Sequence, residues 1–349
     1  MVQVVIVGQG IAGSVLALQL LRHNVSVLIL NNRIGNIAST AAAGIYNPVT
    51  GRHMVKSWYA EELFPYLHTF YQSIEKTLGV NFFHPLPLFR PFLTEQERAA
   101  WSLKHPSSSV NTDFASCITH TSSILKAAYQ GFGSLEVKQA GYVDVPKFLH
   151  AVRIYFKYLG IYRETIFKYK DLRLGRWVQY ENITAQYIIF CEGPQVAYNP
   201  FFRLLPFRLV KGELLSGSLA PPRKAIYNRG VFILPHHANR TLVGATYARG
   251  DLSLRPTSKA RELIEARLHK IFNVKYTVKA QRVGIRPATF DRKPFVGMHT
   301  HHPQVGIFNG LGSKGISLAP YLARLLVDHL MEGKILPKSI QPQRIQNNP

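Results

Sequence analysis

A glycine-rich turn between two apolar segments constrains this chain more than any other feature. The apolar run 4–7 predicts a buried strand, and the sequence Gly-Gln-Gly-Ile-Ala-Gly follows it over 8–13. An amphipathic run over 14–22 then leads into a second apolar strand over 25–30. The order of strand, glycine turn, helix and strand predicts the βαβ unit that opens a dinucleotide-binding domain.

Each glycine of this turn has a separate physical role. Gly8 allows the tight turn, Gly10 lets the backbone approach a pyrophosphate, and Gly13 lets the helix pack closely on the strand. We expect Ile11 and Ala12 to contribute as well, because a helix N-terminus offers N–H groups and a positive dipole end to phosphates. A dinucleotide is therefore the first ligand that the sequence predicts.

The residue that usually holds the ribose is altered. An acidic side chain is expected at the end of the second strand, and Asn31 or Asn32 stands there instead. An amide oxygen accepts one hydroxyl hydrogen bond, more weakly than a carboxylate does. The prediction of a phosphate site is unaffected, and the ribose contact is weakened.

Composition limits the class of protein. A length of 349 residues suits two domains, and 46% hydrophobic with 17% charged residues is typical of a globular chain. Cys117 and Cys191 are the two cysteines, so the sequence predicts no disulfide framework and favours a reducing compartment. The first apolar run has no preceding Lys or Arg and is interrupted by glycines, unlike a signal peptide. We expect a cytoplasmic protein with no integral membrane segment.

The net charge of +23 admits two interpretations. A field of that sign attracts anionic partners such as RNA, acidic lipid headgroups or anionic metabolites. Alternatively the cations are scattered, solvated side chains, since no run of Lys or Arg exceeds two residues. Five histidines lack the spacing of metal ligands, and we expect loop positions and no metal site for them: His236, His237, His299, His301 and His302.

Later segments suggest further contacts with a flat or anionic ligand. Small residues over 38–48 let a backbone come close to such a ligand, and a plain alanine-rich helix start is the alternative. The apolar run 185–190 predicts a strand that ends near Gly193. A second glycine loop over 310–315 follows the apolar run 305–309 and opens a helix, which makes another anion-receiving N-terminus.

Taken in order, these segments resemble the D-amino-acid oxidase family of flavoproteins. Its members include glycine oxidase, sarcosine oxidase and the oxidase half of the bifunctional tRNA wobble-uridine enzyme. The resemblance covers nearly the whole chain and rests on five segments: 8–13, 41–44, 141–146, 284–297 and 310–320.

The resemblance implies an α/β fold with FAD as the cofactor. A discontinuous Rossmann-type FAD-binding domain would comprise 1–80, 141–206 and 282–340. An antiparallel-sheet substrate domain would comprise 81–140 and 207–281. The remaining residues, 341–349, are expected to form a disordered tail.

The resemblance also assigns roles to residues. Arg286 would bind a substrate carboxylate, for which a planar guanidinium is well shaped, although a salt bridge to Asp291 is the alternative. Tyr46 and Tyr247 are predicted on the substrate side, although either could simply be packing. The second glycine loop would present helix N-terminal amides to the flavin N1 and C2 carbonyl. The full predicted set for FAD is Gly8, Gly10, Ile11, Ala12, Gly13, Asn31, Asn32, Thr40, Ala43, Gly44, Gly193, Gly310, Leu311, Gly312, Ser313, Lys314, Gly315 and Ile316.

The implied activity is oxidation of a carbon–nitrogen bond of an amino acid or glycine-like secondary amine, with hydride passing to flavin N5. That step requires no catalytic residue beyond the flavin. Two alternatives remain open. A stand-alone tRNA wobble-uridine carboxymethylaminomethyl oxidase would explain the positive charge and the local similarity over 244–251. A non-catalytic flavin-binding protein would explain the loss of the acidic ribose residue.

Overall fold

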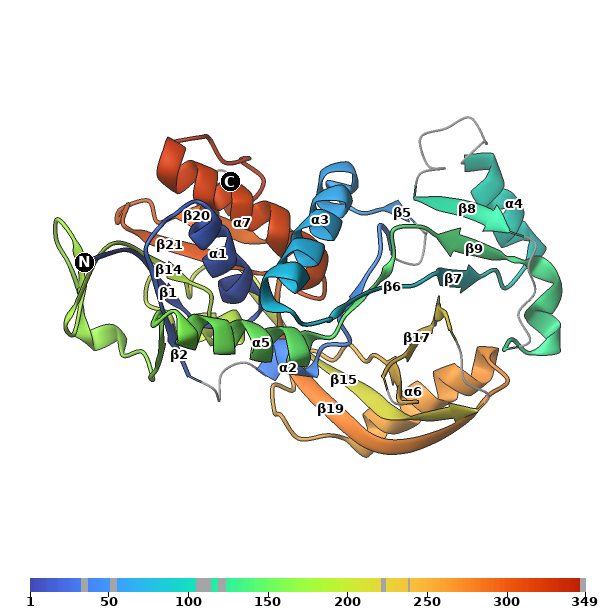
Figure 1. Cartoon of the computed structure of the whole chain (residues 1–349). Helices are drawn as coiled ribbons and strands as arrows, with labels where there is room; N and C mark the ends of the chain where they lie inside the picture. Colours follow the sequence, from blue (N-terminus) through green and yellow to red (C-terminus); the bar gives the residue numbers. More distant parts are fainter. Residues whose placement is uncertain are drawn as a thin grey trace.

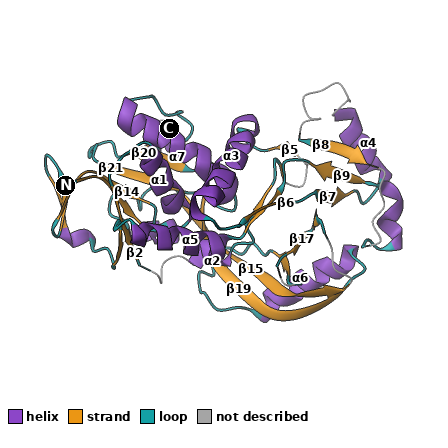
Figure 2. Cartoon of the chain, viewed as in Figure 1, coloured by secondary structure: helices purple, strands orange, loops and turns teal. Residues whose placement is uncertain are grey.

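The computed structural model describes residues 1–32, 37–50, 55–104, 114–118, 124–220, 224–237 and 239–345. Two large sheets, one mainly parallel and one mainly antiparallel, lie at opposite ends of the molecule, with helices packed on both (Figures 1 and 2). The helices are α1 Ile11–Arg22, α2 Ile37–Ala41, α3 Ala60–Leu78, α4 Glu95–Lys104, α5 Val145–Tyr158, α6 Ser258–Ile271 and α7 Gly315–Glu332.

The first sheet is built around four parallel neighbours. β2 (Val27–Asn31) pairs with β1 (Val2–Val7), β1 with β14 (Ile183–Phe190), and β14 with β21 (Val305–Asn309). These strands are apolar on both faces, as expected when helices cover a parallel sheet. The edges are completed by β11 Tyr162–Glu164, β12 Leu172–Leu174, β13 Val178–Tyr180 and β20 Phe295–Met298.

Helices α1 and α7 pack against each other on this sheet, and α3 packs on α7 (Figure 1). Val15, Leu16 and Leu20 of α1 are fully buried in the core between these elements. Among the described helices, none combines the length and the apolar character that crossing a bilayer requires.

The second sheet has the order β19-β15-β18-β17-β16-β7-β9-β8. Its members are β7 Leu88–Pro91, β8 Ala115–Ile118, β9 Ser134–Val137, β15 Phe207–Ala220, β16 Ile226–Arg229, β17 Val231–Pro235, β18 Thr241–Gly244 and β19 Lys275–Thr289. All neighbours are antiparallel except β16 and β7. Smaller sheets join β3 Ile45–Tyr46, β10 Gly141–Val143 and β6 Phe83–Pro85, and pair β4 Val49–Thr50 with β5 Val55–Lys56.

The predicted fold class is confirmed, since a Rossmann-type parallel sheet and an antiparallel sheet are both present. Strands from 81–140 and from 207–281 share the antiparallel sheet, which supports the proposed grouping of those two ranges. One boundary differs, because β19 continues beyond 281 to Thr289 while it remains paired with β15. Arg286 therefore belongs to the antiparallel sheet.

The C-terminal segment also differs from the prediction. Pro342–Ile345 forms a short 3-10 helix instead of a disordered tail. The Arg344 guanidinium donates to both carboxylate oxygens of Asp291, at 3.0 and 3.2 Å, and lies 3.8 Å from the centre of the Phe295 ring. These contacts hold the segment against Asp291 and Phe295, and the composition of the tail alone does not reveal them. Residues 346–349 lie outside the described residues.

Candidate functional site

The carboxyl ends of the parallel strands form one side of the candidate site, which we call the cofactor edge: Gly8–Gly13, Asn31, Gly193 and Gly310–Ile316. Because β2, β1, β14 and β21 run in parallel, the segments that follow them leave the sheet at the same edge. The Asn309 amide donates to the Gly193 carbonyl at 2.9 Å, which ties two of these segments together. The edge therefore unites glycine segments from three distant parts of the sequence.

The two glycine loops meet at the cofactor edge. A Cβ placed on Gly315, the first residue of α7, would lie 3.5 Å from Cγ2 of Ile11, the first residue of α1. A Cβ on Gly13 would overlap the Gly8 carbonyl, so Gly13 must be glycine for α1 to approach the loop this closely. The N-termini of α1 and α7 thus lie side by side, as the paired loops predict.

Helix capping at this edge fits an anionic cofactor. At α5 and α6, the side chains of Asp144 and Thr257 cap the helix N-terminus. At α1 and α7, the N-cap residues Gly10 and Lys314 make no side-chain cap, and neither first turn carries an acidic residue. Both helices thereby leave positive dipole ends uncompensated by acidic side chains of their own, which suits a pyrophosphate and a flavin.

The remaining predicted FAD residues are found in different environments. Asn31 is 2% exposed, accepts from the Gln9 N–H at 2.8 Å and donates to the Tyr162 hydroxyl at 3.1 Å. Its amide therefore supports the glycine loop in addition to any ribose contact. Asn32 and Ala43 are half-buried, and Thr40 is exposed on α2. The Gly44 carbonyl accepts from the Val143 N–H at 3.0 Å.

Around the second loop, Leu311 and Ile316 are buried, and Ser313 is exposed enough to face a ligand. The Lys314 ammonium donates to the Ser57 hydroxyl at 3.2 Å, and burial with the nearby Arg292 lowers the pKa of Lys314. The sequence patterns did not predict one contact at this edge. The Ser39 hydroxyl of α2 accepts from the Ile11 N–H at 3.2 Å. A hydroxyl in a small-residue segment is too common a signal to predict this.

Arg286 occupies a built position on β19, which we call the arginine seat: Gly212, Thr246 and Tyr247 around the Arg286 guanidinium. A Cβ on Gly212 would overlap the guanidinium, so this glycine on β15 makes the space for it. Arg286 donates to the Thr246 carbonyl at 3.1 Å, and its guanidinium carbon lies 5.7 Å from the centre of the Tyr247 ring. The seat holds a planar cation against the sheet.

The alternative role of Arg286 is not supported by the geometry. Asp291, the acid nearest in sequence, forms its salt bridge with Arg344. Among the described residues, no carboxylate lies within 4.0 Å of the Arg286 guanidinium. Burial lowers the pKa of Arg286, but a guanidinium stays cationic in a protein. The seat therefore holds a positive charge that its own surroundings do not neutralise.

The arginine seat adjoins the cofactor edge. The Gly312 N–H donates to the carbonyl of Pro287, the residue after Arg286, at 3.1 Å. A Cβ on Gly312 would lie 3.8 Å from Ala288. An anion held by Arg286 would consequently be close to the second glycine loop.

Two buried charges anchor the loop that begins at Tyr247. Lys211, 1% exposed, donates to Asp251 at 2.6 Å and to the Arg255 carbonyl at 2.8 Å. Glu213, 3% exposed, accepts from the N–H and the hydroxyl of Thr257, both at 2.9 Å. Tyr247 itself is 59% exposed, so an anchored loop presents a largely solvent-facing phenol beside Arg286.

Tyr46 is not part of this arrangement. Its ring is 1% exposed, stacks on Phe83 with centroids 5.2 Å apart, and meets the His68 ring edge-on at 5.5 Å. The packing interpretation therefore holds for Tyr46, whose β3 position faces the core instead of the arginine seat.

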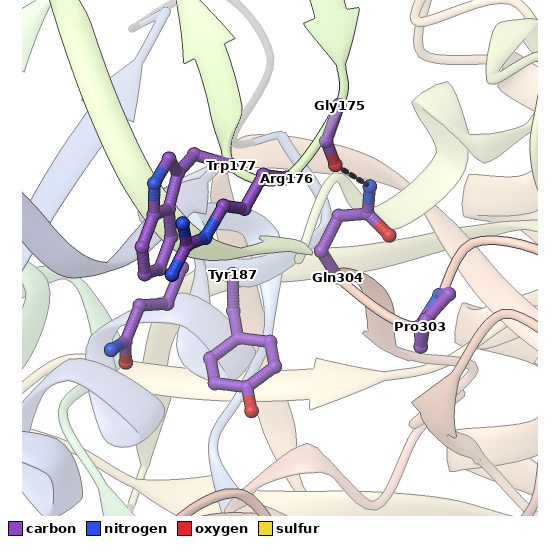
Figure 3. Close-up of a pocket in the computed structure, with 7 residues that line it drawn as sticks. Gly175, Arg176, Trp177, Tyr187, Pro303 and Gln304 are labelled. Atoms are coloured by element: carbon purple, nitrogen blue, oxygen red, sulfur yellow. Dashed lines mark hydrogen bonds between the residues drawn. The ribbon is translucent and has the colours of Figure 1, made fainter.

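A hollow elsewhere on the parallel sheet lies away from the cofactor edge. Its lining comes from the turn between β12 and β13, from β14 and from the residues before β21, so it sits toward the amino end of β21 (Figure 3). The Gln304 amide donates to the Gly175 carbonyl at 3.2 Å across it. Among the residues that line this hollow, only Arg176 and the Tyr187 phenol are ionisable. We therefore assign no reaction to it.

Comparison with known proteins defines the class. The sequence profile of the DAO family, described as FAD dependent oxidoreductase, matches residues 3–329. The chain belongs to this family of FAD-dependent oxidoreductases. It is 30% identical over 162 residues to the glycine oxidase of Bacillus subtilis (strain 168), a match that covers 44% of this chain and 43% of that protein. The matched part thus spans less than half of that relative.

Solved structures extend the likeness to the whole fold. The crystal structure of glycine oxidase from Geobacillus kaustophilus superposes with a TM-score of 0.79 at 21% identity, covering 96% of this chain and 95% of that one. The structure of L-proline dehydrogenase from P. horikoshii gives a TM-score of 0.80 at 15% identity, covering 99% and 98%. At these identities the superpositions establish the fold.

Proposed function

We propose that this chain oxidises the carbon–nitrogen bond of a small amino acid or glycine-like secondary amine that carries a carboxylate. The observation that carries the proposal is Arg286, a largely buried guanidinium with no described carboxylate partner, held beside the cofactor edge. A buried cation without a counter-charge is costly, and an anionic ligand would remove that cost. The glycine oxidase and L-proline dehydrogenase named above support a substrate of this kind.

The residues of the chain would bind and orient such a substrate. The two guanidinium N–H pairs of Arg286 suit a bidentate grip on a carboxylate, and the Thr246 carbonyl and the Gly212 backbone fix the plane of that grip. The loop anchored by Lys211 and Glu213 places Tyr247 over the same group. When bound at the cofactor edge, FAD supplies the hydride acceptor. Orientation and exclusion of water are then the contribution of the protein.

Arg286→Met tests the proposal directly. Loss of a charge-assisted contact is expected to lower kcat/KM for the amine substrate by about 30- to 1000-fold, or about 2 to 4 kcal/mol, while flavin content stays normal. Arg249→Met is the matched control, because it removes the same charge at an exposed position in the neighbouring loop that carries Tyr247. Equal losses in the two variants would point to long-range attraction and would contradict a carboxylate grip.

The substrate itself is identified by anaerobic titration of the flavin absorbance with glycine, sarcosine, proline and wobble-modified tRNA. Bleaching by a small amine supports the main proposal. Bleaching by tRNA alone would favour the RNA substrate, for which the +23 charge is the observation in favour. Flavin bands that no amine bleaches would leave the non-catalytic alternative.

A further inference from the structure

Three histidines and an aspartate from separate segments converge beside the small β3-β10-β6 sheet, at the start of α5 and the turn after β17. The ligand atoms of Asp144, His236 and His237 all lie within 4.8 Å of one another. The Asp144 Oδ2 atom is 3.7 Å from Nε2 of His236 and 3.7 Å from Nε2 of His237. The Nε2 atom of His84 lies 3.0 Å from Nε2 of His237.

The topology explains why sequence spacing did not predict this cluster. His84 on β6 stands opposite Tyr142 on β10, and Asp144 comes two residues after Tyr142. His236 and His237 follow β17, in the turn to β18. The Tyr142 ring lies against both His84 and His236, with centroids 4.7 and 5.1 Å away. The three possible ligands Asp144, His236 and His237 thereby meet although they come from two distant parts of the chain, and His84 lies beside His237.

We propose that Asp144, His236 and His237 form a three-donor binding site for a divalent transition-metal ion such as Zn²⁺, with water as the fourth ligand and His84 beside the site. Imidazole nitrogen with a carboxylate oxygen is a donor set that suits zinc and its first-row neighbours. Bonds of about 2.0–2.1 Å to a tetrahedral ion put neighbouring donors about 3.3 Å apart. The separations of 3.7 Å between Asp144 Oδ2 and the two histidine Nε2 atoms are close to that spacing.

The cluster is ordered and accessible. The Asp144 Oδ1 atom accepts from the Lys147 N–H at 3.3 Å, and this cap of α5 leaves Oδ2 for the histidines. The side chain of His236 is 4% exposed and that of His237 is 45% exposed, so an ion can enter from solvent.

Cationic side chains compete with an ion here. Arg240, Arg282 and Lys147 face the cluster, and Arg240 Nη2 lies 3.0 Å from Nδ1 of His236. Because a guanidinium can only donate, this contact places the His236 proton on Nε2. Metal binding requires the proton on Nδ1 and therefore requires Arg240 to move away, which its exposed position allows. Arg240 is thus expected to weaken the site.

An ion held by these three protein donors would act as a structural clamp. It would join the turn after β17, in the antiparallel sheet, to the start of α5, which packs beside the parallel sheet. This role is independent of the proposed amine oxidation, because the donors differ from the residues of the arginine seat and the cofactor edge.

The experiment uses the untagged full chain with flavin bound, stripped by a chelator and dialysed against Zn²⁺. We expect about one ion per chain by elemental analysis, and visible bands of tetrahedral coordination when Co²⁺ replaces Zn²⁺. His237→Ala is expected to lose both signals with flavin content unchanged. His301→Ala removes an exposed histidine from another cluster and is expected to retain both. Arg240→Met is expected to tighten Zn²⁺ binding about tenfold.

Two results would overturn the proposal. One is a wild-type chain that binds no more Zn²⁺ than the His237→Ala variant. The other is an equal loss in His301→Ala, which would mean that surface histidines bind the ion without a built site.

Discussion

The cofactor edge and the arginine seat differ in which parts of the chain form them. The edge consists mainly of backbone at the ends of parallel strands, where Gly8, Gly193 and Gly310 follow three neighbouring strands. The seat consists of side chains and carbonyls from strands that meet only in the folded sheet, and the Thr246 carbonyl is 40 residues from Arg286 in the sequence. A short local motif can specify the first kind of site, whereas the second depends on register between distant strands.

The difference between the two regions suggests where each is vulnerable. Backbone at the edge tolerates few changes, because neighbouring segments touch without intervening side chains. The seat tolerates changes that preserve the plane of the guanidinium. Three substitutions test this contrast, and they are taken in order of decreasing effect.

Gly13→Ala should have the largest effect. The new Cβ would overlap the Gly8 carbonyl, so α1 must move away from the loop. We expect a loss of about 3 kcal/mol in the free energy of unfolding and loss of bound flavin, despite the better helix propensity of alanine. Chemical denaturation measures the free energy of unfolding, and the flavin-to-protein absorbance ratio measures the bound flavin.

Gly131→Ala is the control for that substitution. Gly131 is exposed in a 3-10 helix, and nothing lies within 4 Å of a Cβ placed on it. A change within about 0.5 kcal/mol is expected there. If Gly13→Ala retained both stability and flavin, the close approach of loop and helix would not be what fixes the cofactor edge.

Gly212→Ala should affect the seat without affecting the edge. The added methyl group takes the space of the Arg286 guanidinium, so the guanidinium must leave its plane. We expect kcat/KM for the amine substrate to fall about 10- to 100-fold, with normal flavin content.

A double-variant cycle sharpens this result. In an Arg286→Met background, Gly212→Ala should add little further loss, because the side chain that it displaces is already gone. Additive losses would show that Gly212 acts on the sheet itself instead of through Arg286.

Sequence patterns predicted the edge far better than the seat. The glycine turn, the helix that follows and the loop over 310–315 are each local, so their physical roles can be inferred without knowing the fold. Arg286 and Tyr247 were predicted by family resemblance, and they do meet. Gly212 was not predicted, because a glycine in a strand has many possible causes and its partner lies on another strand.

Tyr46 and the histidine cluster show the same limit of single-sequence analysis. A tyrosine near a glycine turn gives no sign of whether it faces the core, and its burial against Phe83 depends on β6. The spacing of His236 and His237 gives no indication of His84 or Asp144, which the β6–β10 pairing brings near. Long-range pairing, which single-sequence reasoning cannot supply, decides both.

Glu192 offers the smallest and most specific test, because it is a titratable side chain next to Gly193 of the mainly backbone-built edge. It precedes Gly193, accepts from the Tyr169 hydroxyl at 2.5 Å and from the Asn199 amide at 2.7 Å. Burial raises the pKa of Glu192 to about 7, from an ordinary value of 4.5. Between pH 4.5 and 7 the folded chain therefore holds a proton that the unfolded chain has released, so the free energy of unfolding falls as pH rises through that window.

Glu192→Gln replaces the titrating carboxyl with an amide. The dependence of the free energy of unfolding on pH should therefore become flatter. Relative to wild type, the variant is expected to gain about 1 to 2 kcal/mol between pH 4.5 and pH 8, measured by denaturant unfolding at each pH. Tyr169→Phe is expected to act in the opposite direction, because the hydroxyl that donates to the carboxylate lowers the pKa of Glu192. Parallel profiles for wild type and both variants would mean that Glu192 is solvated in the folded chain and that the cofactor edge is insensitive to its charge.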